Sequence, residues 1–215
     1  MSGDNLGVKA PGPKGRILAV LIAAAAGVGL GAGAFALRLA QPGTAAPSGP
    51  AAGTPAIGGP FRLVDAQGSP VDERLLRGKW SAVFFGYTYC PDVCPATLQT
   101  LQAASEQLGP DGKKLQVVLI SVDPERDTPE ALRAYLSSFR FPGGVHGLTG
   151  SPEQVQAALK AFRGYAARRG EGSDYLMDHT GAIYLMDPEG RFSRPLTGGM
   201  DAKQMAGQIR SAMSA

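Results

Sequence analysis

The sequence predicts a layered α/β domain with a further segment on its N-terminal side. Three apolar runs typical of buried strands occupy residues 82–85, 115–121 and 183–186. Segments with helical periodicity lie between and after them. Because strands covered on both faces are apolar throughout, this alternation indicates a sheet between two layers of helices.

The first half of this domain is expected to contain a hairpin, a strand and a helix. Residues 61–64 and Val71 flank the polar turn at 65–68, a pattern that predicts the hairpin. After the strand at 82–85, Pro95 is well placed to open a helix that ends before the Gly-Pro pair beginning at Gly109.

The second half is expected to continue the alternation. The strand at 115–121 leads into the loop SVDPERDTP, and Pro129 opens a helix. Ser151 and Gln154 have the spacing of a capping box for a third helix. The remaining predicted elements are the strand at 183–186, a strand around Phe192 and a last helix capped by Asp201 and Gln204.

The N-terminal segment reads as a membrane anchor. Residues 17–37 carry no charge, and as a helix they would span about 32 Å against a hydrocarbon core of roughly 30 Å. Three basic residues precede this run and only Arg38 follows it, so the positive-inside rule places residues 1–16 in the cytoplasm. We expect a transmembrane helix over 17–39. The competing interpretation is a signal peptide cleaved after the Ala-Phe-Ala sequence at 34–36, although its apolar region would be unusually long.

Composition separates this anchor from the domain. Residues 40–60 are rich in Pro, Gly and Ala and are predicted to be a linker, which leaves 61–215 as the globular domain. The chain carries a formal net charge of +3, but residues 41–215 hold 17 basic and 17 acidic side chains. The sequence therefore has no basic surface typical of a protein that binds nucleic acid.

Cys90 and Cys94 are the only cysteines, and they lie where a helix is expected to begin. Four positions apart on helical backbone, their Cα atoms would be roughly 6 Å apart, which permits a disulfide or shared binding of a metal ion. A helix N-terminus lowers the pKa of a nearby thiol, and the thiolate is both nucleophile and metal ligand. The pair is interpreted as a redox switch, a metal chelate or both. A purely structural disulfide would stabilise the fold little, because its loop is so short.

The two histidines differ in their surroundings. His146 lies in PGGVHGLTG and is expected in an exposed turn, whereas His179 comes shortly before the strand at 183–186. In a thioredoxin-like domain the turn before such a strand lies against the cysteine loop, and thioredoxins place a cis proline there. Here a histidine stands at that place. Two thiolates and an imidazole suit copper or zinc, and the alternative is a hydrogen-bonded histidine with no chemical role.

Three acidic residues are secondary candidates. Asp178 precedes His179 and can orient its ring as a second partner of the imidazole. Asp92 lies between the cysteines and Asp123 follows the strand at 115–121. Their default interpretation is a helix cap or a loop carboxylate, and a role near the cysteines is the alternative.

Three blocks of the sequence together resemble the Sco/SenC family: FGYTYCPDVCP, SVDPERDTP and DHTGAIYLMDPEGRF. This resemblance implies a thioredoxin-like fold, in its peroxiredoxin-like variant, with a central sheet flanked by helices and an N-terminal transmembrane helix. It also implies copper, Cu(I) or Cu(II), as the metal and places the family's ligands on Cys90, Cys94 and His179. The family's acidic positions correspond to Asp92, Asp123 and Asp178.

The same resemblance implies a function and a location. The chain is expected to be a copper metallochaperone that delivers copper to the CuA site of cytochrome c oxidase subunit II, with a periplasmic copper donor and a thiol reductant as further partners. Residues 1–16 lack the Arg- and Ser-rich, amphipathic character of a mitochondrial presequence, so a bacterial inner-membrane protein facing the periplasm is expected. The alternatives are a thiol-disulfide oxidoreductase that reduces the CuA cysteines, for which Cys90 and Cys94 would be the catalytic pair, and a redox or copper sensor.

Overall fold

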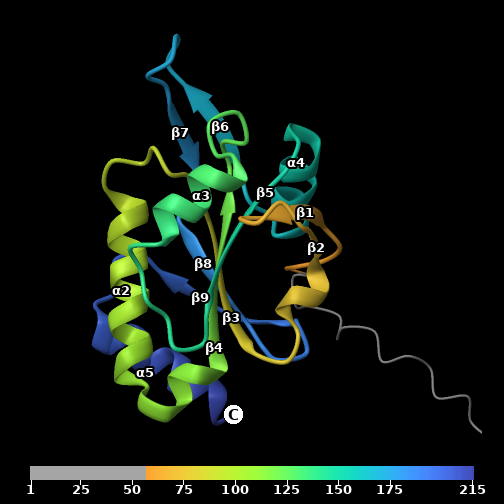
Figure 1. Cartoon of the computed structure of the whole chain (residues 1–215). Helices are drawn as coiled ribbons and strands as arrows, with labels where there is room; N and C mark the ends of the chain where they lie inside the picture. Colours follow the sequence, from red (N-terminus) through yellow and green to blue (C-terminus); the bar gives the residue numbers. More distant parts are fainter. Residues whose placement is uncertain (1–56) are drawn as a thin grey trace, which may run out of the picture. The chain divides into compact units, whose positions relative to one another are not determined.

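Figure 1 shows the computed structural model of the chain, which describes residues 57–215. The predicted tail and anchor at 1–39, and most of the predicted linker at 40–60, lie outside these residues. Within 57–215 no helix has both the length and the apolar character that a membrane span requires. The described part includes Gly58, whose N–H donates to the carbonyl of Ala161 at 3.0 Å.

A seven-stranded sheet forms the centre of the domain, with the strand order β2-β1-β5-β4-β3-β8-β9. The strands β3, β4 and β5 are parallel, and β8 runs antiparallel beside β3. The elements in chain order are β1 (Arg62–Asp65), β2 (Pro70–Asp72), η1 (Glu73–Leu76), β3 (Trp80–Gly86), α2 (Val93–Gln107), η2 (Gly109–Lys114), β4 (Leu115–Ser121), α3 (Pro129–Leu136), β5 (Val145–Thr149), α4 (Pro152–Ala161), β6 (Ala166–Arg169), β7 (Leu176–His179), β8 (Ala182–Met186), β9 (Phe192–Thr197) and α5 (Ala202–Met213). The predicted α/β architecture is confirmed.

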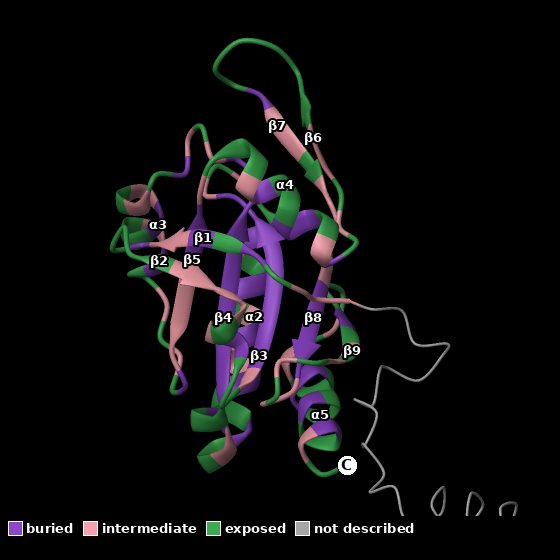
Figure 2. Ribbon diagram, turned by 90° about the vertical axis from the view of Figure 1, so that its right-hand side faces the viewer, coloured by how far each residue is buried: buried purple, intermediate pink, exposed green. Residues whose placement is uncertain are grey.

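Alternate residues of the central strands face two separate apolar cores. In β3, Ala82 and Phe84 pack with residues of α2 and α5, whereas Val83 and Phe85 pack with residues of α4. Because side chains alternate along a strand, one strand supplies both cores. Figure 2 shows β3, β4 and β8 buried along their length, with the exposed residues on the helices and loops around them.

The helix ends follow the sequence signals closely. Thr128 caps α3 through a hydrogen bond from the N–H of Ala131. Ser151 with Gln154, and Asp201 with Gln204, form complete capping boxes at α4 and α5. The helix α2 is different: it begins at Val93, and so takes in Cys94, rather than beginning at Pro95.

The prediction for His146 was wrong. His146 belongs to β5 and is half-buried, and burial and nearby Lys79 lower its pKa. The glycines around His146 are typical of a turn, but Gly147 instead allows Leu136 of α3 to pack closely on the strand. A Cβ at position 147 would lie 2.7 Å from Leu136 Cδ1. The strand needs glycine because α3 crosses it so closely.

The hairpin of β6 and β7 is the second feature that the sequence did not predict. These strands pair with each other, Ala166 opposite His179, and form a separate two-stranded sheet. Figure 1 shows the hairpin standing above the end of the main sheet where β3 and β4 finish. His179 is therefore the last residue of a strand rather than part of a simple turn.

Candidate metal centre

The cysteines lie between the carboxyl end of β3 and the beginning of α2. Both are free thiols in the structure. Tyr87 and Thr88 leave the sheet, and a turn closed by the bond from the Cys90 N–H to the Tyr87 carbonyl, 3.3 Å long, leads to Asp92. The strand end and the helix start together fix the backbone on either side of both cysteines.

The sulfur of Cys90 acts as the capping acceptor at the start of α2. Asp92 is the N-cap residue of α2, yet its side chain makes no capping bond, and the Cys90 Sγ accepts the N–H of Cys94 at 3.4 Å instead. Burial raises the pKa of the Cys90 thiol, but hydrogen bonds from Cys94 and from the N–H groups of Asp92 and Val93 outweigh it and leave the pKa lowered. The expected effect of the helix start on a thiol is thus confirmed for Cys90.

Cys94 has the opposite character. Its residue is 2% exposed, and a Cβ added to Gly86 would lie 2.9 Å from its Sγ, so the sulfur fits tightly against β3. Burial raises the pKa of Cys94 to about 12, and the thiol of Cys90 and the charge of Asp127 add to this effect. At neutral pH the pair therefore combines an accessible, more acidic thiol with a buried one that keeps its proton.

His179 reaches the cysteine loop from the hairpin. Its ring meets the ring of Tyr87 edge-on, with 5.9 Å between the ring centres. Its Nδ1 lies 3.1 Å from the carbonyl oxygen of Thr180. An Nδ1–H that donates to this carbonyl leaves Nε2 free to bind a metal ion.

Cys94 and His179 line one small cavity of about 10 Å³, together with Thr97, Gly181 and Ile183. Among residues 57–215, however, no three His, Cys, Asp or Glu side chains are already gathered for a metal ion. Cys94 is packed into the core, and the ring of His179 contacts that of Tyr87. Larger surface hollows of about 450 and 580 Å³ lie beside β1 and β2 and are lined by neither cysteine nor histidine.

Two of the acidic candidates are exposed, and neither is a hydrogen-bond partner of the imidazole. Asp178 is exposed and pairs with Arg169 at 3.5 Å. Neighbouring residues of a strand point to opposite sides, so the side chain of Asp178 points away from that of His179. The carbonyl of Thr180, rather than Asp178, is the hydrogen-bond partner of His179. Asp92 is exposed at the start of α2.

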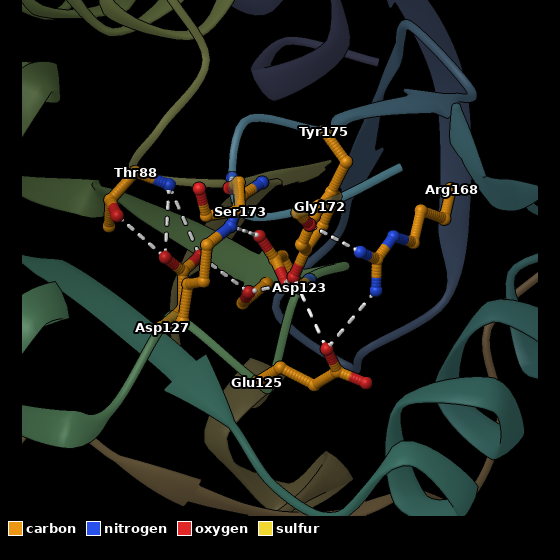
Figure 3. Close-up of polar contacts among 10 residues, drawn as sticks. Thr88, Asp123, Glu125, Asp127, Arg168, Gly172, Ser173 and Tyr175 are labelled. Carbon is orange, nitrogen blue, oxygen red and sulfur yellow. Dashed lines mark hydrogen bonds and ion pairs between the residues drawn. The ribbon is translucent and has the colours of Figure 1, made fainter. Parts of the chain in front are cut away.

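Asp123 is buried and belongs to a polar cluster shown in Figure 3. It accepts hydrogen bonds from the hydroxyl of Tyr175 at 2.6 Å and from Nε of Arg126 at 2.5 Å. Burial, followed by the carboxylate of Asp123, raises the pKa of Tyr175 to about 12. Asp123 therefore links the loop after β4 to the β6–β7 hairpin.

Asp127 is a residue that the sequence analysis missed. It is fully buried and accepts hydrogen bonds from the Thr88 hydroxyl at 2.6 Å, the Thr88 N–H at 3.1 Å and the Ser121 hydroxyl at 2.6 Å. Burial raises the pKa of Asp127. Thr88 lies at the start of the cysteine loop, so the hydrogen bonds that Asp127 accepts from it hold that end of the loop in place. The motif SVDPERDTP places Asp127 in the loop after β4, but its burial follows from contact with Thr88, which is distant in the sequence.

Known proteins of one family match this chain. The family model SCO1/SenC matches residues 49–214. The Arabidopsis thaliana SCO1 homolog 1, a mitochondrial protein, is 44% identical over 150 residues, which are 69% of this chain and 44% of the relative. The protein SenC of Rhodobacter capsulatus is 45% identical over 134 residues, which are 62% of this chain and 60% of the relative. The chain thus spans about half the length of these relatives.

The fold is matched by solved structures as well. The structure of Bradyrhizobium japonicum ScoI with copper bound is 42% identical, has a TM-score of 0.65, and corresponds to 73% of this chain and 99% of that one. The predicted thioredoxin-like α/β fold agrees with this match. From its matched residues and its fold, the chain belongs to the SCO1/SenC family.

Proposed function

We propose that this protein is a copper metallochaperone whose ligands are Cys90, Cys94 and His179. The observation that carries the proposal is the cavity shared by Cys94 and His179, together with the Cys90 sulfur, which lies 3.4 Å from the backbone nitrogen of Cys94. Copper suits these donors, because Cu(I) prefers thiolate and imidazole ligands. Copper bound to the related ScoI structure supports this choice of metal.

The two thiols suggest an order of binding. Cys90 has the lowered pKa and is the more accessible, so it is the natural first ligand for an arriving ion. Copper then displaces the proton of Cys94, as ligation of a thiol by a metal generally does. Nε2 of His179 completes the site after the ring moves to the bound ion, and copper leaves by stepwise exchange with the thiolates of an acceptor.

The proposed acceptor is the CuA site of cytochrome c oxidase subunit II. Sco family proteins bind copper and take part in assembly of cytochrome c oxidase. We also propose that residues 17–39 anchor the chain in a bacterial inner membrane, that 40–60 tether the domain, and that the domain faces the periplasm. A periplasmic donor would then supply the copper, and a thiol reductant would keep both cysteines reduced.

Copper binding by the purified, reduced full-length chain tests the ligand set. One Cu(I) per chain is expected. Replacing Cys90 with Ala should weaken Cu(I) binding by two orders of magnitude or more, and His179→Ala should weaken it about 10- to 100-fold. His146→Ala is the matched control, because it removes the other imidazole, which lies in β5. An affinity that His179→Ala leaves unchanged would exclude His179 as a ligand.

A thiol-disulfide oxidoreductase is the second candidate function. The unequal thiols favour it, since an accessible thiol of lowered pKa beside a buried one suits disulfide exchange. The Cys90 thiolate would attack a target disulfide and release one target thiolate. Cys94, losing its proton to the departing target sulfur, would then attack the Cys90 sulfur of the mixed disulfide and release the second target thiol. The target disulfide has then gained two electrons, and a Cys90–Cys94 disulfide remains.

Complementation separates these two functions. In a strain that lacks this protein, we expect membranes with low oxidase activity and low copper content. The wild-type chain should restore both, and His179→Ala should not. Full rescue by His179→Ala would favour the oxidoreductase, because that variant keeps both thiols.

A further inference from the structure

The β6–β7 hairpin carries His179, yet its backbone does not join the main sheet. Within residues 57–215, β6 and β7 pair with each other and neither strand belongs to the seven-stranded sheet. Its base is fixed by the two-residue connection from His179 to β8 and by the bond from the Thr180 N–H to the Tyr165 carbonyl, and beyond this base contacts of side chains help to hold it over the end of β3 and β4. Figure 2 shows that much of it is exposed or half-buried.

Several polar side chains join the hairpin to the loop after β4, and we call three of them, Tyr175, Asp123 and Arg126, the latch. Figure 3 labels Tyr175 and Asp123 of this group. The buried Tyr175 hydroxyl donates to Asp123 Oδ1 at 2.6 Å. Cζ of Arg126 lies 3.6 Å from the centre of the Tyr175 ring, and Nε of Arg126 donates to Asp123 Oδ2. Nη1 of Arg126 also donates to the carbonyl of Ser173, in the tip of the hairpin, at 3.2 Å.

The same guanidinium reaches the cysteine loop. Cζ of Arg126 lies 4.7 Å from the ring centre of Tyr89, which directly precedes Cys90, and 5.9 Å from that of Tyr87. The Tyr87 ring in turn contacts the ring of His179. Arg126 thus touches both segments that carry the proposed copper ligands.

We propose that the latch is a positioning device that sets the hairpin, and with it His179, over the cysteine loop. This inference rests on the proposed function, because it concerns the placing of a proposed ligand. The latch residues do not bind copper themselves: Arg126 pairs with Asp123, and the Tyr175 hydroxyl is already bonded. A buried hydrogen bond to a charged acceptor, together with a cation over an aromatic ring, holds the hairpin where no backbone ladder does.

Tyr175→Phe tests the latch, because it keeps the ring and removes the donor to Asp123. Tyr165→Phe is the matched control: the same atom is removed next to the same hairpin, but the Tyr165 side chain is 62% exposed and its described hydrogen bonds come from its backbone. Both variants are made in the full-length chain.

The first measurement is amide hydrogen exchange in the metal-free, reduced protein. Tyr175→Phe should speed exchange of the amides of β6 and β7 about tenfold, since opening of the hairpin no longer breaks that bond. Exchange in β3 and β4 should stay unchanged, and Tyr165→Phe should match the wild type throughout. Unchanged exchange in β6 and β7 of Tyr175→Phe would overturn the proposal.

The second measurement is the electron paramagnetic resonance spectrum of the Cu(II)-loaded protein. The nitrogen coupling that His179→Ala abolishes should become weaker or heterogeneous in Tyr175→Phe and remain intact in Tyr165→Phe. A hairpin that exchanges faster while its copper spectrum stays that of the wild type would show that the latch does not position His179. If His179→Ala leaves the wild-type spectrum unchanged, the proposed function fails instead, which is a distinguishable result.

A second variant, Arg126→Lys, tests the latch independently in case Tyr175→Phe does not fold correctly. Arg126→Lys keeps the positive charge beside Asp123 but loses the planar group that lies over Tyr175 and Tyr89. It should change both measurements in the same direction as Tyr175→Phe. Wild-type behaviour of Arg126→Lys in both would contradict the role given to the guanidinium.

Discussion

At the residue scale, two cysteines only four positions apart have different chemistry because they face different surroundings. The Cys90 sulfur accepts a hydrogen bond from the N–H of Cys94 at the start of α2, whereas Cys94 itself is packed against Gly86 in the core. The helix start lowers the pKa of one thiol and burial raises that of the other to about 12. Sequence spacing predicted that a thiol would be acidified there, but not which of the two it would be.

This difference predicts how the thiols react with iodoacetamide. In the reduced, metal-free chain the rate at Cys90 should rise and level off at a lower pH than for an ordinary thiol, because its thiolate forms at lower pH. Cys94 should stay almost unmodified at that pH. Mass spectrometry of the Cys90→Ser and Cys94→Ser variants measures each thiol separately, and equal profiles for the two would contradict the assignment.

The buried Asp127 leads to a second prediction at this scale. Asp127→Ala should lower the free energy of unfolding by about 2–4 kcal/mol, because the Thr88 and Ser121 hydroxyls lose their buried acceptor. Urea denaturation measures the loss. Asp92→Ala is the control, since Asp92 is exposed and makes no capping bond, and an equal loss in both variants would rule out the supporting role of Asp127.

The shifted pKa of Asp127 also predicts the direction in which the free energy of unfolding changes with pH. The pKa is raised above 3.8 in the folded state, so the native protein binds this proton more tightly than the unfolded chain. The contribution of Asp127 to stability is therefore largest below its ordinary pKa and is lost as pH rises through the raised value. Asp127→Asn does not titrate, so its stability relative to the wild type should improve as pH rises through that window. A difference independent of pH would contradict the shift.

At the element scale, the site depends on how closely β3 approaches α2. Gly86 is the last residue of β3, and the Cys94 sulfur occupies the space that a side chain at position 86 would need. Gly86→Ala should destabilise the fold by about 1–3 kcal/mol and weaken copper binding, because the sulfur must move. Gly199→Ala, where nothing lies within 4 Å of an added Cβ, should do neither. Wild-type stability and copper affinity in Gly86→Ala would show that the sulfur has room.

The elements also show where sequence patterns fail. Apolar runs predicted β3, β4 and β8, Pro129 predicted the start of α3, and capping residues predicted the starts of α4 and α5, since all these signals are local. The strand β5 was missed because its glycine is required by the helix α3 that packs on it. The strands β6 and β7 were missed because side-chain contacts such as that of Tyr175 with Asp123, distant in the sequence, hold them in place.

At the scale of the whole molecule, the parallel strands bring distant parts of the chain together at one end of the sheet. The cysteine loop, the loop after β4 and the β6–β7 hairpin meet there, and each contributes a residue to the contacts of Arg126. The sequence predicted the candidate ligands from their residue types and the order of the strands. The latch and Asp127 depend on contacts between separate loops, which no single motif contains.

The ligand set is the central claim, and X-ray absorption at the copper edge tests it most directly. The Cu(I)-loaded, reduced full-length chain should have two sulfur ligands and one nitrogen ligand, and His179→Ala should keep the sulfurs and lose the nitrogen. A wild-type spectrum with two sulfurs alone, identical to that of His179→Ala, would contradict the account.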